Sequence, residues 1–368
     1  MASDLTRPAL AGLVPYEPGK PVEEVQRELG LERVVKLASN EGQFGPFPAA
    51  LAALERGLPE LNRYPDGGAY RLVAALAEKH GVEPANVAVA GGADAIINYL
   101  SMALLDPGDE VVSGWPSFPS YVLDATKMGA TAMCVPLTDH RYDVERILAA
   151  VTERTKIAYL CNPNNPTGTM ISRAEVDAFL AAVPDHVLTV LDEAYHEYIE
   201  EPDYPDGIEE HFKAGRPVLV LRTFSKIYGL AGLRVGYGIG PAEVVDAIKK
   251  VRNAFEVTQP AQDAAVASLG DSEEVARRRR QNAEARARLV EACEELGLHV
   301  ATPAVANFVY AEVGDDSRPA FEALLREGVI VRPLAGFGAP GAIRVTVGTP
   351  EETDLFAQAF RRVSVASR

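Results

Sequence analysis

A lysine at the end of an apolar run has the most reactive chemistry in this sequence. Lys226 directly follows the run VLVLRTFS, residues 218–225. Lysine is almost never buried unless it is paired, and burial lowers its pKa. An uncharged amine can then form an imine with a carbonyl compound. Thr223, Ser225 and Arg234 are close in sequence and offer the hydroxyl and guanidinium donors that suit a phosphate.

Two further polar features follow apolar runs earlier in the chain. Asp192 ends the run HVLTVLD, and a carboxylate there is costly to bury unless a cation or good hydrogen bonds compensate it. A protonated pyridine nitrogen is one such cation. The segment NPNNPTG, residues 162–168, follows the run KIAYLC, and its two prolines predict a rigid turn. An amide side chain held there could donate a hydrogen bond to a cofactor oxygen.

A glycine turn completes the set. Gly91-Gly92-Ala93-Asp94 follows the run VAVAG and opens a helical pattern, so backbone N–H groups and the helix N-terminus could receive an anion. Each feature alone also has a structural explanation as a cap or a loop. Together they supply an imine-forming lysine, a carboxylate for a ring nitrogen, an amide for a ring hydroxyl and a phosphate site. Pyridoxal phosphate (PLP) is the cofactor that needs this set.

These features occur where apolar runs end, which is where open α/β sheets bind their ligands. The predicted strands cover residues 87–91, 110–114, 130–137, 156–161, 186–192, 218–225 and 234–240. Amphipathic segments, such as residues 69–80, 94–105 and 172–183, lie between them. Because the runs are apolar without alternation and are spaced by helical patterns, they predict a mostly parallel central sheet flanked by helices, an α/β fold.

The pattern changes after about residue 241. Helices are expected over residues 241–255, 272–297 and 318–328, and strands over 307–313 and 342–348. This indicates a smaller α+β domain, formed by the C-terminal segment together with the N-terminal arm. We divide the chain into an arm over residues 1–40, which packs with the small domain and a neighbouring subunit, a large PLP-binding domain over 41–255, and a small domain over 256–368.

The composition excludes several classes of partner. The 368 residues carry a formal net charge of -16, which argues against nucleic acid and anionic membrane surfaces as partners. The run Arg277–Arg280 indicates a solvated helix face with nearby glutamates. Three scattered cysteines suit a reducing compartment. No signal peptide opens the chain, and no apolar run approaches the roughly 20 residues of a membrane span, so we expect a cytoplasmic protein.

Two motifs that suggest other cofactors lack necessary residues. His196-Glu197-Tyr198 has no second histidine at the i+4 position, so no metal is expected there. Gly236-Tyr-Gly-Ile-Gly240 lacks the spacing and the ribose-binding acid of a dinucleotide site.

Ten ordered motifs resemble those of the fold-type I PLP-dependent aminotransferases over nearly the whole chain, and within them the histidinol-phosphate aminotransferase branch. They are LVPYEPGKP (13–21), KLASNE (36–41), GPFP (45–48), RYPDGGAYRL (63–72), GGAD (91–94), WPSFPSY (115–121), NPNNPTG (162–168), DEAY (192–195), TFSKIYGLAGLRVGY (223–237) and IRVTVGT (343–349). The chain departs from the family pattern at Gly42-Gln43, near the expected substrate entrance, and at Ala95.

The resemblance implies a role for each matching cofactor residue. Lys226 would hold PLP as a Schiff base and move the substrate proton, and Asp192 would pair with the pyridinium nitrogen. Tyr64 would reach the phosphate of the neighbouring subunit's cofactor, which implies a homodimer with shared active sites. The remaining implied contacts are Asn165 and Tyr195 to the ring hydroxyl oxygen, Phe118 stacked on the ring, and Gly92, Ala93, Asp94, Thr223, Ser225 and Arg234 at the phosphate.

The resemblance also implies the substrate contacts and the reaction. Arg344 would bind the anionic end of the substrate with help from Arg332, while Tyr16 and Asn40 would close over it. The expected reaction is ping-pong transamination of L-histidinol phosphate and 2-oxoglutarate to imidazole acetol phosphate and L-glutamate. The alternatives are an aromatic amino acid aminotransferase on the same scaffold, a PLP-dependent decarboxylase of a phosphorylated amino acid and, last, a non-catalytic PLP-binding effector domain.

Overall fold

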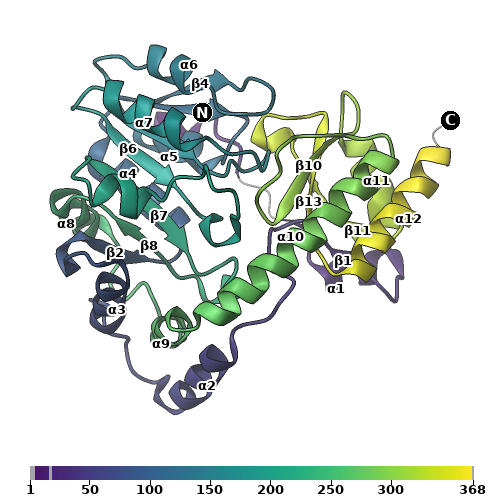
Figure 1. Cartoon of the computed structure of the whole chain (residues 1–368), viewed down its shortest axis with the longest axis horizontal. Helices are drawn as coiled ribbons and strands as arrows, with labels where there is room; N and C mark the ends of the chain where they lie inside the picture. Colours follow the sequence, from purple (N-terminus) through teal and green to yellow (C-terminus); the bar gives the residue numbers. More distant parts are fainter. Residues whose placement is uncertain (1–4, 16–18, 367–368) are drawn as a thin grey trace.

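The computed structural model describes residues 5–15 and 19–366, and three sheets, of seven, four and two strands, organise this part of the chain (Figure 1). The largest sheet has its seven strands in the order β2-β8-β7-β6-β5-β3-β4. Its strands are β2 (Val87–Ala90), β3 (Glu110–Trp115), β4 (Thr131–Pro136), β5 (Thr155–Cys161), β6 (Leu188–Asp192), β7 (Val218–Thr223) and β8 (Gly236–Ile239). All neighbours are parallel except β8, which runs antiparallel to β2 and β7. The predicted α/β fold with a mostly parallel sheet is therefore confirmed.

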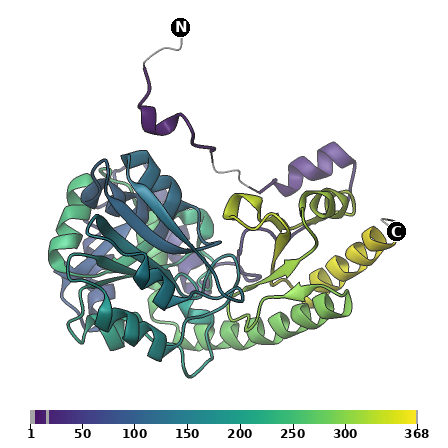
Figure 2. The ribbon, with the colours of Figure 1, turned by 90° about the horizontal axis from the view of Figure 1, so that it is seen from above.

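Helices cover the large sheet, and the two views show them on either side of it (Figures 1 and 2). They are α3 (Tyr70–His80), α4 (Ala93–Leu104), α5 (Ser120–Met128), α6 (Val144–Ala149), α7 (Arg173–Ala182) and α8 (Ala242–Val251). Helix α9 (Gln259–Leu269) packs on α3, and α2 (Pro48–Gly57) packs on α9. Local sequence sets some of their ends: Ser172 and Glu175 form a capping box at the start of α7. Strands such as β5 and β7 are buried because these helices shield both faces, which explains their unbroken apolar runs, whereas the edge strand β4 is largely exposed.

The smaller unit contains a four-stranded antiparallel sheet and a short parallel pair. The four strands, in spatial order, are β12 (Arg332–Pro333), β13 (Ala342–Thr346), β10 (Phe308–Glu312) and β9 (His299–Val300), while β1 (Val35–Lys36) pairs with β11 (Val329–Ile330). The helices of this unit are α1 (Val22–Leu29), α10 (Ser272–Glu295), α11 (Arg318–Arg326) and α12 (Pro350–Ala366). Val35 and Leu37 share an apolar cluster with Leu289 and Phe356, so the end of the predicted arm packs into the small unit.

Helix α10 joins the two units (Figure 1). Near its start, Arg278 is buried and donates to the carbonyl of Ile227, and further along Arg286 donates to the carbonyl of Val305. The expected solvated face of the Arg277–Arg280 run is therefore wrong for Arg278, whose guanidinium also lies 4.3 Å from the ring centroid of Phe47. The charge pattern alone does not reveal that Arg278, one of four consecutive arginines, contacts a backbone carbonyl and an aromatic ring.

The domain boundary predicted at residues 255/256 stays a prediction. Ala261, Ala264 and Ala265 of α9 belong to the same apolar cluster as the large sheet, and α9 packs against α2 and α3. This packing favours a later boundary, near the start of α10. None of the helices in the described residues is both long and apolar enough to span a membrane.

Candidate active site

A cavity of about 380 Å³ lies between the large sheet and the small unit. Its lining contains most of the side chains that the sequence predicted for the site: Asn40, Ala93, Asp94, Phe118, Asn165, Asp192, Tyr195, Thr223, Ser225, Lys226, Arg234 and Arg344. These residues come from segments spread over 300 positions, and the ends of β5, β6 and β7 bring them to one edge of the sheet. Tyr16 lies outside the described residues.

Lys226 follows β7 and carries its amine into this cavity. Its Nζ lies 3.5 Å from the carbonyl oxygen of Ser39 and 5.6 Å from the centroid of the Tyr195 ring. Burial, helped by the positive charge of Arg344, lowers the pKa of Lys226 to about 8. About a tenth of this amine is therefore uncharged at pH 7, far more than for an ordinary lysine, and the uncharged form is the nucleophile.

Asp192 ends β6 and is buried below the cavity. The hydroxyl of Tyr121 donates to its Oδ2 at 2.6 Å, and the backbone N–H of Ala194 donates to Oδ1 at 3.2 Å. Burial raises the pKa of Asp192. Because the hydrogen-bond partners found among the described residues are neutral, a cation placed against this carboxylate would stabilise its charged form.

Tyr121 is a site residue that the sequence analysis missed. Its ring is buried and stacks on Tyr159 with centroids 4.3 Å apart, so its hydroxyl is held towards Asp192. Tyr121 closes the motif WPSFPSY, which drew attention to Phe118 instead. Nothing in the sequence around a helical tyrosine indicates that a carboxylate 71 positions away will accept a hydrogen bond from its hydroxyl.

A network of amides and hydroxyls covers the other side of the cavity. Nδ2 of Asn40 donates to the hydroxyl oxygen of Tyr195 at 2.9 Å. Asn40 is buried with φ 53°, and its backbone N–H donates to Oγ1 of Thr346 on β13. Arg344 donates to the amide oxygen of Asn165, which leaves the Asn165 amide nitrogen as the donor for a ligand. The pKa of Tyr195 is raised by burial, so its hydroxyl stays protonated.

An anion site lies where α4 begins. Gly92 precedes the helix with φ 102°, and a Cβ at this position would come within 2.7 Å of Nη2 of Arg234, so the turn requires glycine. Arg234 itself has φ 53° and donates to Oγ of Ser225 and to the carbonyls of Ala231 and Gly91. Its hydrogen-bond partners within the described chain are uncharged, so its positive charge is available to an anion such as a phosphate.

Two predicted residues lie apart from the cavity lining. Arg332 on β12 is directly opposite Arg344 on β13, and both are buried. Tyr64 is 83% exposed and stacks on Phe255 with centroids 4.8 Å apart. Tyr64 therefore makes no contact with the cavity of its own chain, and its predicted role depends on a second subunit.

The residues present fit pyridoxal phosphate. The cavity offers an amine of lowered pKa, a buried carboxylate with neutral partners, an amide donor and an arginine beside a helix N-terminus. These groups match in kind the aldehyde, ring nitrogen, ring oxygen and phosphate of that cofactor. Fold and site together define the class of PLP-dependent aminotransferases of fold type I.

The chain belongs to the family of class I and II aminotransferases, whose model matches residues 32–360. It is 45% identical over 358 residues to a histidinol-phosphate aminotransferase of Moorella thermoacetica, covering 97% of this chain and 92% of the relative. A second histidinol-phosphate aminotransferase, from Carboxydothermus hydrogenoformans, is 46% identical over 98% of this chain and 99% of the relative. The crystal structure of the Sinorhizobium meliloti histidinol-phosphate aminotransferase in complex with pyridoxal-5'-phosphate superposes with a TM-score of 0.89 at 30% identity, covering 100% of this chain and 99% of that one.

A buried ion pair anchors the strand ends that carry Asp192 and Lys226. Arg222 on β7 donates to Oε2 of Glu193 through Nε at 3.0 Å and Nη2 at 2.7 Å, and both residues are buried. Gly207 donates its backbone N–H to the other carboxylate oxygen. The ion pair thus links Glu193, the neighbour of Asp192 in the sequence, to β7, the strand that leads to Lys226.

Replacing Arg222 with methionine should destabilise the protein by about 3–5 kcal/mol, because Glu193 would stay buried without its cation. Urea unfolding followed by circular dichroism measures this loss. The control is Arg326→Met, which breaks the exposed pair of Arg326 with Glu322 and should change stability by less than about 1 kcal/mol. Equal losses in the two variants would show that the buried pair has no special role.

Proposed function

We propose that the protein uses PLP to transfer the amino group of L-histidinol phosphate to 2-oxoglutarate, giving imidazole acetol phosphate and L-glutamate. The observation that carries this proposal is a single cavity whose lining includes four charged side chains. They are Lys226 with its lowered pKa, the buried Asp192, Arg234 near the start of α4, and Arg344 of the small unit. The similarity to histidinol-phosphate aminotransferases over nearly the whole chain supports the choice of substrate.

When bound, PLP supplies an aldehyde that takes up the amino group and a ring that withdraws electrons from the substrate carbon. Lys226 would hold the cofactor covalently through its amine, and that amine, once freed by the substrate, would serve as general base and then general acid for the proton of the substrate carbon. Asp192 would keep the ring nitrogen protonated, with Tyr121 holding that carboxylate in place. Asn165 and Tyr195 would bind the ring oxygen, Phe118 would stack on the ring, and the start of α4 would hold the phosphate.

Two arginines favour a substrate with an anionic end. Arg332 and Arg344 are cross-strand neighbours, and like charges directly opposite each other are destabilising. Their guanidiniums lie 5.6 Å and 5.2 Å from the ring centroid of Phe337, a residue that lines the cavity. A phosphate or carboxylate bound here would reduce their repulsion. The same pair can serve the phosphate of histidinol phosphate and the carboxylate of 2-oxoglutarate in turn, as ping-pong kinetics requires.

The pKa of Lys226 predicts how pH affects cofactor capture. The apoenzyme amine is uncharged above a pKa of about 8, so the rate of PLP capture should rise about tenfold from pH 7 to pH 9 and then level off. Stopped-flow absorbance of the cofactor measures this rate. Arg344→Gln removes a positive charge that lowers this pKa, and the midpoint should move to higher pH. A rate that instead rises in proportion to hydroxide up to about pH 10 before levelling off would indicate a lysine of ordinary pKa.

A panel of amino donors tests the substrate. Purified holoenzyme is mixed separately with histidinol phosphate, phenylalanine, tyrosine and glutamate, and absorbance reports conversion of the cofactor from its aldehyde to its amine form. We expect fast conversion with histidinol phosphate and glutamate. Fast conversion with the aromatic amino acids but none with histidinol phosphate would instead identify an aromatic aminotransferase, and release of CO₂ would identify a decarboxylase.

We also propose that the enzyme works as a cytoplasmic homodimer. The side chains of Tyr64, Tyr70 and Leu5 are 83%, 76% and 88% exposed. Exposed large apolar side chains of this kind favour burial against a second subunit. Tyr64 from one subunit would reach the cofactor phosphate of the other. The test is a mixture of two inactive variants, Tyr64→Ala and Lys226→Ala: mixed dimers pair an intact Tyr64 with an intact Lys226 in one of two sites and should regain activity. A mixture that stays inactive would contradict shared sites.

A further inference from the structure

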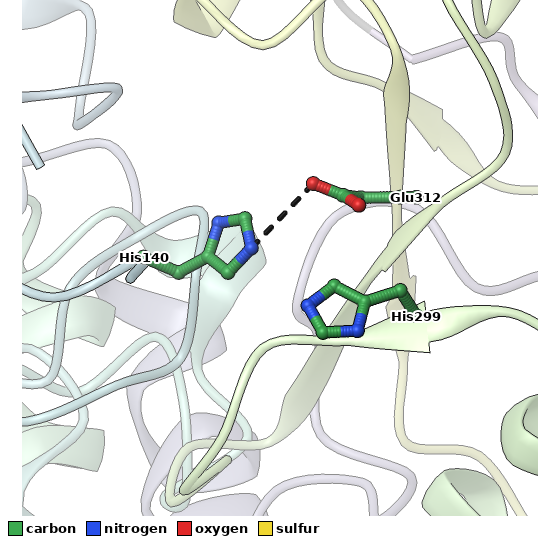
Figure 3. Close-up of side chains that lie close together, drawn as sticks. All are labelled: His140, His299 and Glu312. Carbon is green, nitrogen blue, oxygen red and sulfur yellow. Dashed lines mark ion pairs between the residues drawn. The ribbon is translucent and has the colours of Figure 1, made fainter. Parts of the chain in front are cut away.

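Three side chains that commonly bind metals meet at a place outside the cavity lining. His140, His299 and Glu312 each place a ligand atom so that all three atoms lie within 4.8 Å of one another. Figure 3 shows the His140 ring facing the other two side chains across a gap. His140 lies between β4 and α6 of the large unit, whereas His299 and Glu312 lie on β9 and β10 of the small unit. The cluster therefore spans the two units.

The two residues of the small unit are held as a cross-strand pair. His299 and Glu312 are direct partners in the antiparallel register of β9 and β10, so their side chains project from the same face of the sheet. Tyr310, two residues before Glu312, shares that face, and its ring packs against His140 with centroids 5.0 Å apart. The small unit thus presents an imidazole and a carboxylate side by side, next to the ring that contacts His140.

The third ligand is held by a tight turn. Thr138 and Arg141 exchange backbone hydrogen bonds of 3.0 and 2.9 Å around Asp139 and His140, which have φ of 49° and 62°. This is the conformation of a type I′ hairpin turn, although neither central residue is glycine. Oγ1 of Thr169 donates to the carbonyl of His140 at 2.7 Å. The turn and this bond fix the backbone from which the His140 ring reaches the small unit.

The geometry is close to that of a three-ligand metal site. Bonds of about 2.0–2.1 Å in a tetrahedral site put neighbouring ligand atoms about 3.4 Å apart. Nε2 of His140 and Oε1 of Glu312 are 3.5 Å apart, and the remaining ligand atoms, all within 4.8 Å of one another, need to approach by at most about 1.4 Å. Two imidazoles and one carboxylate favour Zn²⁺ and similar transition metals over Mg²⁺ or Ca²⁺. Partial exposure of the three residues leaves room for a water as fourth ligand.

We propose that His140, His299 and Glu312 form a binding site for a divalent transition metal of the Zn²⁺ class, and that the bound ion ties the large unit to the small one. The cavity lies between these same two units, so the ion would restrict the movement of its walls relative to each other. Sequence inspection does not find this site because its ligands are 159 and 13 positions apart rather than in a short motif. The proposal does not depend on the substrate proposed above.

Titration calorimetry of the metal-stripped holoenzyme with Zn²⁺ alone tests the site. We expect one saturable site per chain. Loss of one ligand should weaken it by at least about 100-fold in each of His140→Gln, His299→Gln and Glu312→Gln, since loss of a mere supporting contact already costs 10–100-fold. The matched control is His186→Gln, which removes an exposed histidine elsewhere and should bind as the wild type does. Absence of a saturable site, or unchanged affinity in all three ligand variants, overturns the proposal.

Two further measurements separate metal binding from a folding defect and test the link between the units. In chelator, the melting temperature of each variant should match that of the wild type, and added Zn²⁺ should raise it only in the wild type and His186→Gln. Hydrogen exchange should slow on Zn²⁺ addition both in the turn over residues 138–141 and in β9 and β10. If Zn²⁺ binds but protects only one of these two segments, the ion does not tie the units together.

Discussion

Replacing Lys226 with alanine should lower kcat by at least about 10⁴-fold, which corresponds to about 5.4 kcal/mol of transition-state stabilisation. The variant loses both the amine that bonds to the cofactor and the base that moves the substrate proton. The structure suits Lys226 to both roles, because its amine lies in the cavity and burial lowers its pKa to about 8. Rates with histidinol phosphate and 2-oxoglutarate, under single-turnover and steady-state conditions, measure the loss.

Covalent capture gives a second readout for Lys226. Borohydride reduction of the wild-type holoenzyme should fix the cofactor on the peptide containing Lys226, as mass spectrometry would report, and the variant should carry no such adduct. Lys249→Ala is the matched control, because it removes an exposed lysine from α8 and should leave both adduct and rate unchanged. An adduct of equal yield in Lys226→Ala, with activity retained, would refute the assignment of this residue.

Replacing Asp192 with asparagine should lower kcat by about 10²–10³-fold, the usual effect of removing one preorganised electrostatic partner. The amide preserves the shape of the side chain but removes the negative charge that would stabilise a protonated ring nitrogen. Asp192 is suited to this role because the hydrogen bonds from Tyr121 and Ala194 fix its orientation without neutralising it. The loss should fall mainly on kcat, because cofactor capture by Lys226 does not need the carboxylate.

Absorbance of the bound cofactor and kcat, measured on the same Asp192→Asn preparation, distinguish this role from a folding defect. The holoenzyme should still form, while turnover falls. Asp246→Asn serves as the control, since it replaces an exposed aspartate on α8 whose partner is Lys250. A variant that keeps full turnover would show that the ring nitrogen needs no carboxylate here, and one that binds no cofactor would indicate that Asp192 mainly maintains the structure.

Most strands of the large sheet could be predicted because their burial leaves a direct mark on the sequence. The run KIAYLC becomes β5, whose residues are buried almost throughout, and VLVLRT becomes β7, which is buried along its whole length. The two-residue strands β9, β11 and β12 leave no such mark. Strands β9 and β12 exist because the longer β10 and β13 offer them hydrogen-bonding edges, and β11 pairs with the equally short β1; both pairings are properties of the folded small unit.

The cofactor side of the site was predictable for a related reason. Asp192 ends β6, the turn over residues 162–168 directly follows β5, and Lys226 lies three residues beyond the end of β7. Adjacent parallel strands end at the same edge of a sheet, which brings these positions together. Tyr121 was not predictable, because only the packing of α5 against β3 and β4, with the Tyr121 ring stacked on Tyr159 of β5, brings its hydroxyl to Asp192. The burial of Arg278 is a similar case, since it depends on where α10 crosses the large unit.

The sequence by itself determined the fold class, the kind of cofactor and the position of a lysine just beyond a buried strand, because burial and turns are recorded in the types of neighbouring residues. The tertiary structure alone decided which distant groups meet: Tyr121 with Asp192, Arg344 with Asn165, and His140 with His299 and Glu312. Contacts of this kind depend on the relative placement of whole elements. That placement comes from the summed packing of many side chains, so no short stretch of residues records it.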